Sequence, residues 1–135
     1  MTQEQKDLLL KDLCTRLPYN PMVEYKGKTY NVLGITHHRL VLCKPFMSHT
    51  LDECPLVEEA KPYLFPLSSM TEEQKKEYNR LKHNIQLVNE LGYVVEEAEL
   101  LDSPESFEYL IENNFDYHDL IPNGLANDAT GLNIY

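Results

Sequence analysis

Histidine and cysteine are the side chains of this chain that could ligate a metal. His37 and His38 are adjacent. Adjacent residues of a strand point to opposite faces, so both could bind one ion only from a turn. Cys43, His49 and Cys54 form a second set, but their spacings are six and five, whereas structural zinc ligands usually pair about two to four residues apart. We therefore predict no metal site and no cofactor.

Acid–base chemistry has one candidate group near the end of the chain. Asp116, His118 and Asp119 cluster around Tyr117. Such side chains could transfer protons if they faced a pocket. The alternative is a turn in which Asp116 caps the residues that follow. The chain has no phosphate-binding glycine loop, HExxH helix or GxSxG elbow. We therefore predict the turn, and a protein that is not an enzyme.

The three cysteines do not indicate a disulfide framework. Their number is odd and their spacing irregular. We expect Cys14 on the apolar side of a helix and Cys43 in a buried strand. Cys54 is the candidate for an exposed thiol, but the neighbouring Asp52 and Glu53 disfavour its thiolate. We predict three free cysteines without a catalytic role.

Net charge is distributed very unevenly. Residues 1–82 hold 12 basic and 11 acidic side chains, a net charge of +1. Residues 83–135 hold 11 acidic side chains and no Lys or Arg, a net charge of −11. Phosphate contacts require Lys and Arg, so direct binding of nucleic acid by this region is excluded. A cationic partner is favoured instead. The alternatives are a solvated acidic face that keeps the protein soluble and an acidic face that docks on the more basic N-terminal part of the chain.

Tyrosine accompanies the acidic residues. The chain has nine Tyr and no Trp, and Tyr is favoured at protein interfaces. An ordinary half-buried role in the core is the alternative. We predict a partner-binding surface for a protein with a basic surface, made of Tyr93, Glu96, Glu97, Glu99, Asp102, Tyr109 and Tyr117.

Three helices are predicted from caps and periodicity. Residues 2–17 and 71–91 each begin with Thr followed three residues later by Gln, which is a capping box. Gly92 is placed to end the second helix in a left-handed conformation. Residues 104–114 form the third helix, after a Ser-Pro start.

Strands are predicted at 22–25, 29–35 and 39–43, the last of them central because it is nearly all apolar. Residues 56–60 are either a fourth strand or a helical turn. The apolar run at 63–65 should pack back on the sheet.

These elements predict an α+β fold with a small, bent antiparallel sheet of three to five strands, covered by about three helices. We hypothesise an SH3-like partial barrel. Residues 1–126 are predicted to form a single domain, and residues 127–135 a frayed tail. No apolar stretch is long enough to cross a membrane and the first residues do not resemble a secretory signal, so we expect a cytoplasmic protein.

Several segments resemble a group of small proteins of unassigned activity that gut anaerobic bacteria and their phages and mobile elements encode. They cover about a third of the chain: Met1–Leu8, Asp12–Tyr19, Lys61–Glu73, Asn114–Tyr117, Leu120–Pro122 and Gly124–Ala126. The resemblance implies a mobile-element origin and implies no activity.

Three functional hypotheses follow. The first is a non-enzymatic protein-interaction or regulatory module. The second is an acidic nucleic-acid mimic that inhibits a host DNA-binding protein. The third is a small metal protein or enzyme that uses His37, His38, Cys43, His49 or His118.

Overall fold

The computed structural model describes residues 1–45, 53–88, 91–92, 94–101 and 103–135, and leaves out the side chains of residues 83–88 and 94–101. The chain divides into two compact units. The first is Met1–Ser69 together with Ile111–Tyr135, and the second is Met70–Leu110. The assignment of residues 1–126 to one domain stays a prediction.

The first unit is built on a five-stranded sheet with the order β3-β2-β1-β4-β7. Its strands are β1 (Met22–Tyr25), β2 (Lys28–Thr36), β3 (Arg39–Cys43), β4 (Lys61–Leu64) and β7 (Asn127–Asp128). Together with the helices, this sheet confirms the α+β class. The sheet is open and mixed, because β7 runs parallel to β4 while the other pairs are antiparallel. The expectation of a wholly antiparallel sheet was therefore wrong.

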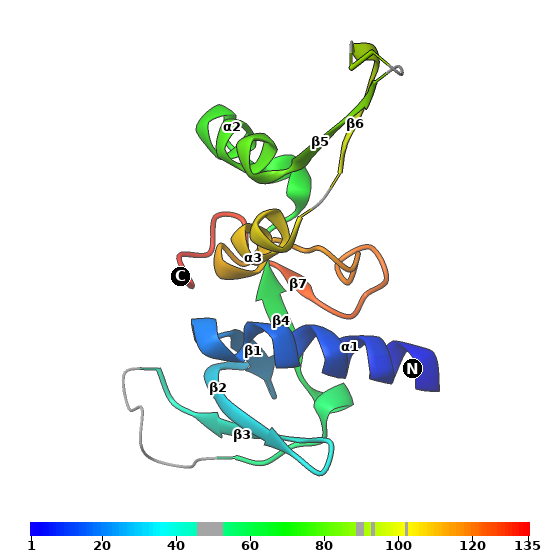
Figure 1. The fold of residues 1–135 in the computed structure, drawn as a ribbon. Helices are drawn as coiled ribbons and strands as arrows, with labels where there is room; N and C mark the ends of the chain where they lie inside the picture. Colours follow the sequence, from blue (N-terminus) through cyan, green and yellow to red (C-terminus); the bar gives the residue numbers. More distant parts are fainter. Residues whose placement is uncertain (46–52, 89–90, 93, 102) are drawn as a thin grey trace. The chain divides into compact units, whose positions relative to one another are not determined.

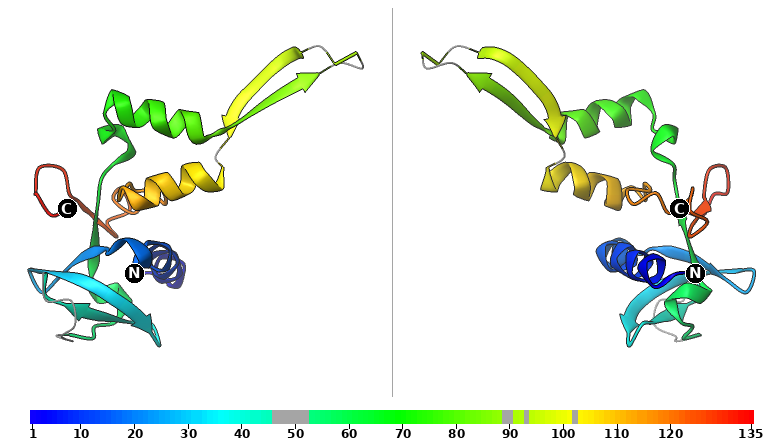
Figure 2. Two further views of the ribbon diagram at one scale, coloured as in Figure 1. Left: turned by 60° about the vertical axis from the view of Figure 1, so that its left-hand side comes forward. Right: turned by 90° about the vertical axis from the view of Figure 1, so that its right-hand side faces the viewer.

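Helix α1 (Gln3–Arg16) covers one face of this sheet (Figures 1 and 2). Its capping box is confirmed, because the Thr2 side chain accepts from the Gln5 backbone and the Gln5 side chain accepts from the Thr2 backbone. Leu9 and Leu13 are fully buried against the sheet. The core also contains buried side chains from the sheet and from the loops beside it: Val23, Tyr30, Val32, Leu40, Leu42, Val57, Leu64, Leu120 and Leu125.

Strand β3 lies at an edge of the sheet, although its apolar sequence indicated a central position. The segment after it compensates for the edge. Leu40 N donates to Pro55 O (2.8 Å) and Leu42 N donates to Glu53 O (2.9 Å). This pairing covers the outer backbone groups of β3, which would otherwise be open to another strand. Residues 57–59 then form the 3₁₀ turn η2 (Val57–Glu59), the helical alternative of the two predicted.

The second unit corrects the helix predicted for residues 71–91. Helix α2 is Glu72–Leu81, with Thr71 and Gln74 in the expected capping box. It is followed by β5 (His83–Val88), which pairs with β6 (Val94–Leu101) as a two-stranded antiparallel sheet. Residues 83–88 include His, Asn, Ile and Val, which are weaker helix formers than the Glu, Gln, Lys, Arg and Leu that make up most of α2. Gly92 does adopt a positive φ of 86°, but it lies in the connection between β5 and β6 and not at the end of a helix.

Helix α3 (Pro104–Glu112) confirms the third predicted helix. The Ser103 hydroxyl accepts from Ser106 N (3.0 Å), and the Ser106 hydroxyl accepts from Ser103 N (2.7 Å). These reciprocal bonds satisfy backbone donors that have no partner inside the helix. Pro104 occupies the first helical position, where a missing N–H costs nothing.

Candidate functional site

The seven residues of the predicted partner-binding surface differ in how far the structure describes them. Tyr93 and Asp102 lie outside the described residues. Glu96, Glu97 and Glu99 lie on β6, whose backbone pairs with β5. The other two residues, both tyrosines, belong to different units, and the seven-residue surface stays a prediction.

Tyr109 and Tyr117 are the two members whose side chains are described. Tyr109 is half-buried on α3. Tyr117 follows α3 and exposes 36% of its surface. Its ring packs edge-on against His118, with the ring centroids 5.1 Å apart. Tyr109 therefore belongs to a helical surface, whereas Tyr117 belongs to a loop.

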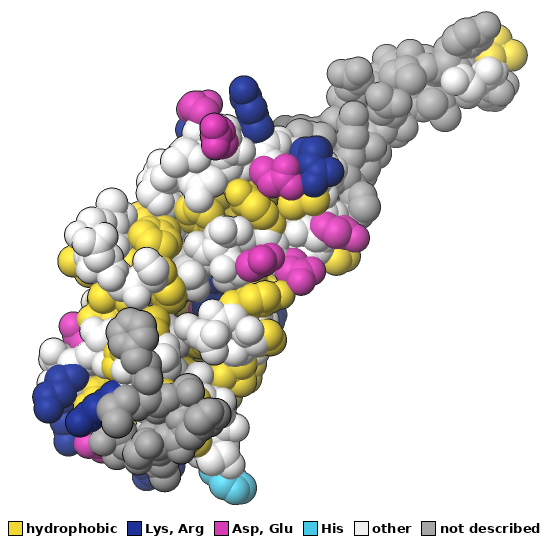
Figure 3. Space-filling model, turned by 90° about the vertical axis from the view of Figure 1, so that its left-hand side faces the viewer, with side chains coloured by type: hydrophobic (Ala, Val, Ile, Leu, Met, Phe, Trp, Pro, Cys, Tyr) yellow, Lys and Arg dark blue, Asp and Glu magenta, His cyan; other side chains and the backbone are white. Residues whose placement is uncertain are grey.

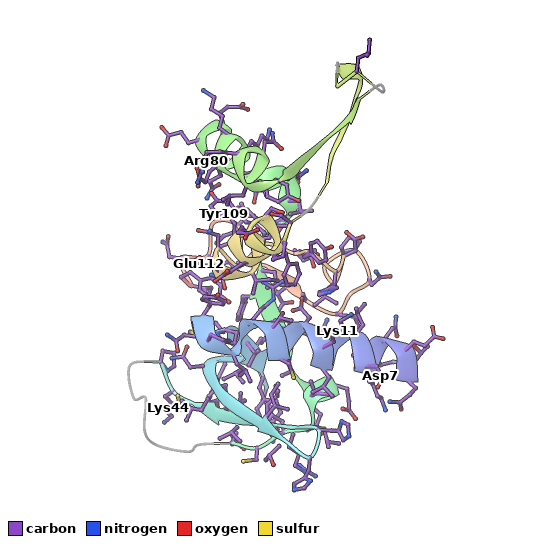
Figure 4. The ribbon with its side chains drawn as sticks, in the orientation of Figure 1. Asp7, Lys11, Lys44, Arg80, Tyr109 and Glu112 are labelled. Atoms are coloured by element: carbon purple, nitrogen blue, oxygen red, sulfur yellow. The ribbon has the colours of Figure 1, made fainter. Side chains whose placement is uncertain are left out.

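An acidic helix face surrounds Tyr109. Glu105, Glu108 and Glu112 are all exposed on α3, at spacings of three and four residues, which place them on one side of a helix. Tyr109 shares that side (Figure 4). We call these four residues the acidic face of α3. Sequence reasoning missed the grouping, although the three- and four-residue spacing of the glutamates was visible.

The opposite side of α3 explains why the acidic face points outwards. Ser106, Leu110 and Ile111 are buried, at 0%, 0% and 1% exposure. A helix that buries an apolar stripe must present its other side to solvent. The orientation of the glutamates is therefore fixed by the burial of these three residues on the opposite side of the helix.

Charges on α2 are organised differently. Lys75 Nζ lies 3.5 Å from Glu72 Oε1, and Arg80 Nη2 lies 2.6 Å from Glu77 Oε1. The hydrogen bond from Arg80 lowers the pKa of Glu77. Basic and acidic side chains consequently alternate on this part of the surface (Figure 3). The acidic face of α3 lies in a stretch of sequence with no Lys or Arg, whereas Glu72 and Glu77 pair with basic side chains of their own helix.

A buried ionic network is the second polar group of interest. Arg16 Nε donates to Asp12 Oδ2 (2.7 Å) and Arg16 Nη2 donates to Asp12 Oδ1 (3.0 Å). Arg16 Nη2 also donates to Phe115 O (2.7 Å), and His118 Nδ1 lies 2.8 Å from Asp12 Oδ1. Asp12 and Arg16 are both fully buried. The network therefore ties α1 to the loop after α3.

This network acts on the ionisation of Asp12. Burial by itself would raise the pKa of Asp12, but hydrogen bonds to His118 and Arg16 outweigh it and hold that pKa below its ordinary value of 3.8. Asp12 is thus an anion that accepts from Arg16 and orients the His118 ring. A buried ion pair of this kind positions the chain segments that it joins, and removal of either partner strongly lowers the stability of the fold.

The three side chains of the candidate acid–base group around Tyr117 make different contacts, in keeping with the predicted turn. Asp116 is buried and accepts from Leu120 N (2.8 Å) and Ile121 N (2.9 Å), which confirms the predicted cap. His118 turns towards Asp12. Asp119 is exposed and has a positive φ of 55°. Asp116 and His118 therefore make separate structural contacts.

None of the three cysteines, all of which the structure describes, forms a disulfide. Cys43 is buried and Cys54 is exposed, as predicted. Cys14 is exposed, so its expected place on the apolar side of α1 was wrong. The reason is helical geometry: the buried side chains Leu9, Asp12, Leu13 and Arg16 take the face that the sequence pattern had extended to Cys14. In the described part of the chain, no three His, Cys, Asp or Glu side chains are grouped as metal ligands.

None of the helices described has the length and hydropathy of a membrane span. Comparisons with protein-family models, with curated proteins and with solved structures found no match for this chain.

Proposed function

We propose that this chain is a cytoplasmic, non-enzymatic interaction or regulatory module that binds a protein with a basic surface. The acidic face of α3 is the surface through which it binds. The observation that carries the proposal is the alignment of Glu105, Glu108 and Glu112 beside Tyr109 on the exposed side of one helix. Carboxylates attract a basic partner over a distance, and Tyr supplies apolar contact area.

The charge density of α3 favours a protein partner over the role of nucleic-acid mimic. Helical rise places the three carboxylates within about 10 Å along the axis. B-form DNA carries about one charge per 1.7 Å, or about six over that length. The acidic face therefore has about half the charge density that a mimic needs. It matches instead the few scattered charges of a protein interface.

Two further proposals concern origin and shape. The resemblance to proteins of gut anaerobes and their phages supports a mobile-element origin for the chain. The register shift between Val32 and Gly34 in the β2–β3 pairing supports bending of the sheet towards an SH3-like partial barrel, because bulges increase local twist.

Neutralising the acidic face tests the proposed function. The tagged chain is used to capture proteins from a gut-anaerobe lysate at low and high salt, and the captured proteins are quantified. We expect basic proteins to be retained by the wild-type chain at low salt and lost at high salt, because exposed charge pairs are screened. The test variant carries Glu105→Gln, Glu108→Gln and Glu112→Gln, and should lose the same proteins at low salt.

A matched control separates the acidic face from net charge. The control variant carries three neutralising changes on exposed glutamates of α1 and α2: Glu4→Gln, Glu72→Gln and Glu73→Gln. It has the same net charge as the test variant, so it should retain the wild-type set of proteins. Equal loss in both variants would mean that bulk charge, and not α3, governs binding. Identical captured sets for all three proteins would refute the proposal.

A further inference from the structure

A pocket of about 280 Å³ opens between α1 and η2 in the first unit. Its apolar lining comes from Leu10 on α1 and from Leu56 and Val57 at η2. Val57 is 2% exposed and anchors this lining in the core. Ligand pockets usually measure about 300–1,000 Å³, so the space suits one short alkyl chain and not a nucleotide or a large cofactor.

Charged side chains of both signs line the same pocket. Asp7 and Glu58 contribute carboxylates, and Lys6 contributes the lining's single ammonium. Lys6 Nζ lies 3.6 Å from Glu58 Oε1, a loose and partly exposed ion pair. Asp7 Oδ1 accepts only from the neutral Gln3 amide among the bonds described for it, at 2.9 Å. Asp7, which Figure 4 labels on α1, is therefore a carboxylate whose charge is not balanced by a described salt bridge.

His38 reaches the pocket from an unfavourable backbone conformation. His37 and His38 form the two-residue turn between β2 and β3, with φ values of 48° and 62°. Left-handed geometry at both central positions favours Asn-Gly and disfavours side chains such as His. Val57 N donates to His38 O (3.0 Å), which fixes the turn against η2. The turn thus places His38 in the lining of the pocket that also contains the two carboxylates.

We propose that this pocket binds an aliphatic cation: an ammonium or guanidinium group on a short alkyl stem. The cation pairs with Asp7 and competes with Lys6 for Glu58, while the stem lies on Leu10 and Leu56, the two apolar lining side chains that are partly exposed. An anion is disfavoured because two carboxylates face one ammonium. A metal ion is disfavoured because these side chains are not grouped as metal ligands in the described structure. The inference is independent of the acidic face of α3.

Amide chemical shifts of the full chain provide the test. n-Butylammonium is titrated into the labelled protein, with butyrate as a probe of the same length and opposite charge. We expect saturable shifts at Lys6, Asp7, Leu10 and Val57 with n-butylammonium, and none with butyrate. The absence of saturable shifts, or equal shifts with butyrate, would overturn the proposal.

Single-residue variants test whether the pocket carboxylates bind n-butylammonium. Asp7→Asn removes one partner of the cation and should weaken n-butylammonium binding about fivefold, the upper range for a partly exposed ion pair. Glu4→Gln makes the same change in charge on an exposed residue of α1 outside the pocket, and should leave binding unchanged. Circular dichroism checks that both variants are folded. Equal weakening by both variants would mean that long-range electrostatic attraction accounts for the binding, and it would contradict the proposal.

The same titration distinguishes two sources of such a cation. Putrescine represents free polyamines, and a lysine-containing peptide represents a protein side chain. Tighter binding of the peptide assigns the pocket to a protein lysine or arginine, and tighter binding of putrescine assigns it to polyamines. Failure of both to compete with n-butylammonium would overturn the proposed site. None of these results changes the interpretation of the lysate experiment on the acidic face of α3.

Discussion

Nδ1 of His118 lies 2.8 Å from Oδ1 of Asp12, although 106 residues separate them in sequence. Arg16 completes the contact by donating to both Asp12 oxygens. The ionic network thus connects the first helix to the loop after the last helix without any metal ligand or disulfide among the described residues. Removing one charged member should lower the stability of the fold, because a buried charge without its partner costs far more free energy than a buried pair.

Replacement of Asp12 should destabilise the first unit strongly. Asp12→Asn leaves the fully buried Arg16 without its anion, so we expect the free energy of unfolding to fall by about 3–5 kcal/mol. Urea denaturation followed by circular dichroism measures the change. Asp7→Asn is the control, because Asp7 is exposed on the same helix, and should change the free energy by less than about 0.5 kcal/mol. Equal effects would show that the network contributes nothing specific.

Acid should weaken the same network. Hydrogen bonds hold the folded pKa of Asp12 below 3.8, its ordinary value, so the unfolded chain takes up the proton at a higher pH than the folded chain. The stabilisation from Asp12 is complete above about pH 3.8 and is lost as the pH falls through the lower folded pKa. Urea denaturation between pH 5 and pH 2 should give a steeper loss in wild type than in Asp12→Asn. Parallel curves would contradict the assignment.

The Tyr135 hydroxyl should stabilise the fold at neutral pH and lose that contribution at alkaline pH. It donates to Tyr63 O (2.8 Å) and accepts from Met22 N (3.1 Å), although the residue as a whole exposes 45% of its surface. Burial of the hydroxyl raises the pKa of Tyr135 to about 12. The unfolded chain ionises near the ordinary value of 10.0, so stability should fall between pH 10 and pH 12.

Tyr135→Phe tests that relationship. The variant loses two hydrogen bonds and should be less stable by about 1–2 kcal/mol at neutral pH. Its spectrophotometric titration should lack the tyrosine that ionises near pH 12. A wild-type titration without a late-ionising tyrosine, or a variant that retains it, would contradict the contact.

Asp116 should matter more than its neighbour Asp119. Asp116 accepts from Leu120 N at Oδ1 and from Ile121 N at Oδ2. Asp116→Asn replaces one of these oxygens by an NH₂ group, which cannot accept, so one of the two bonds is lost. We expect the free energy of unfolding to fall by about 1–3 kcal/mol. Asp119→Asn is an isosteric control at an exposed residue with positive φ, which Asn tolerates. Thermal unfolding of both variants would measure the difference, and a loss confined to Asp119→Asn would contradict the cap.

The His37–His38 turn should be improvable. His37→Asn combined with His38→Gly keeps the left-handed backbone at φ values of 48° and 62° with residues that prefer it. We expect the free energy of unfolding to rise by about 1 kcal/mol. Urea denaturation measures the gain, and the single variant His37→Asn should give a smaller one. A loss of stability would mean that the histidine rings contribute more by contact than the backbone strain costs.

Local chemistry was readable from the sequence. The capping boxes at Thr2 and Thr71, the Asp116 cap and the strands β1, β2 and β3 depend on residues within a few positions of one another, so short patterns determine them. The charge imbalance after Lys82 is likewise a property of the sequence alone. These signals were sufficient for the α+β class.

Tertiary structure decided the rest, because the interactions involved join residues far apart in the chain. The periodicity of residues 83–88 was compatible with a helix, and only pairing with residues 94–101 made them a strand. The parallel position of β7, the contact between Asp12 and His118 and the pocket between α1 and η2 have no short-range pattern. Each of these depends on which surfaces the folded chain brings together, and a single sequence carries no direct record of that choice.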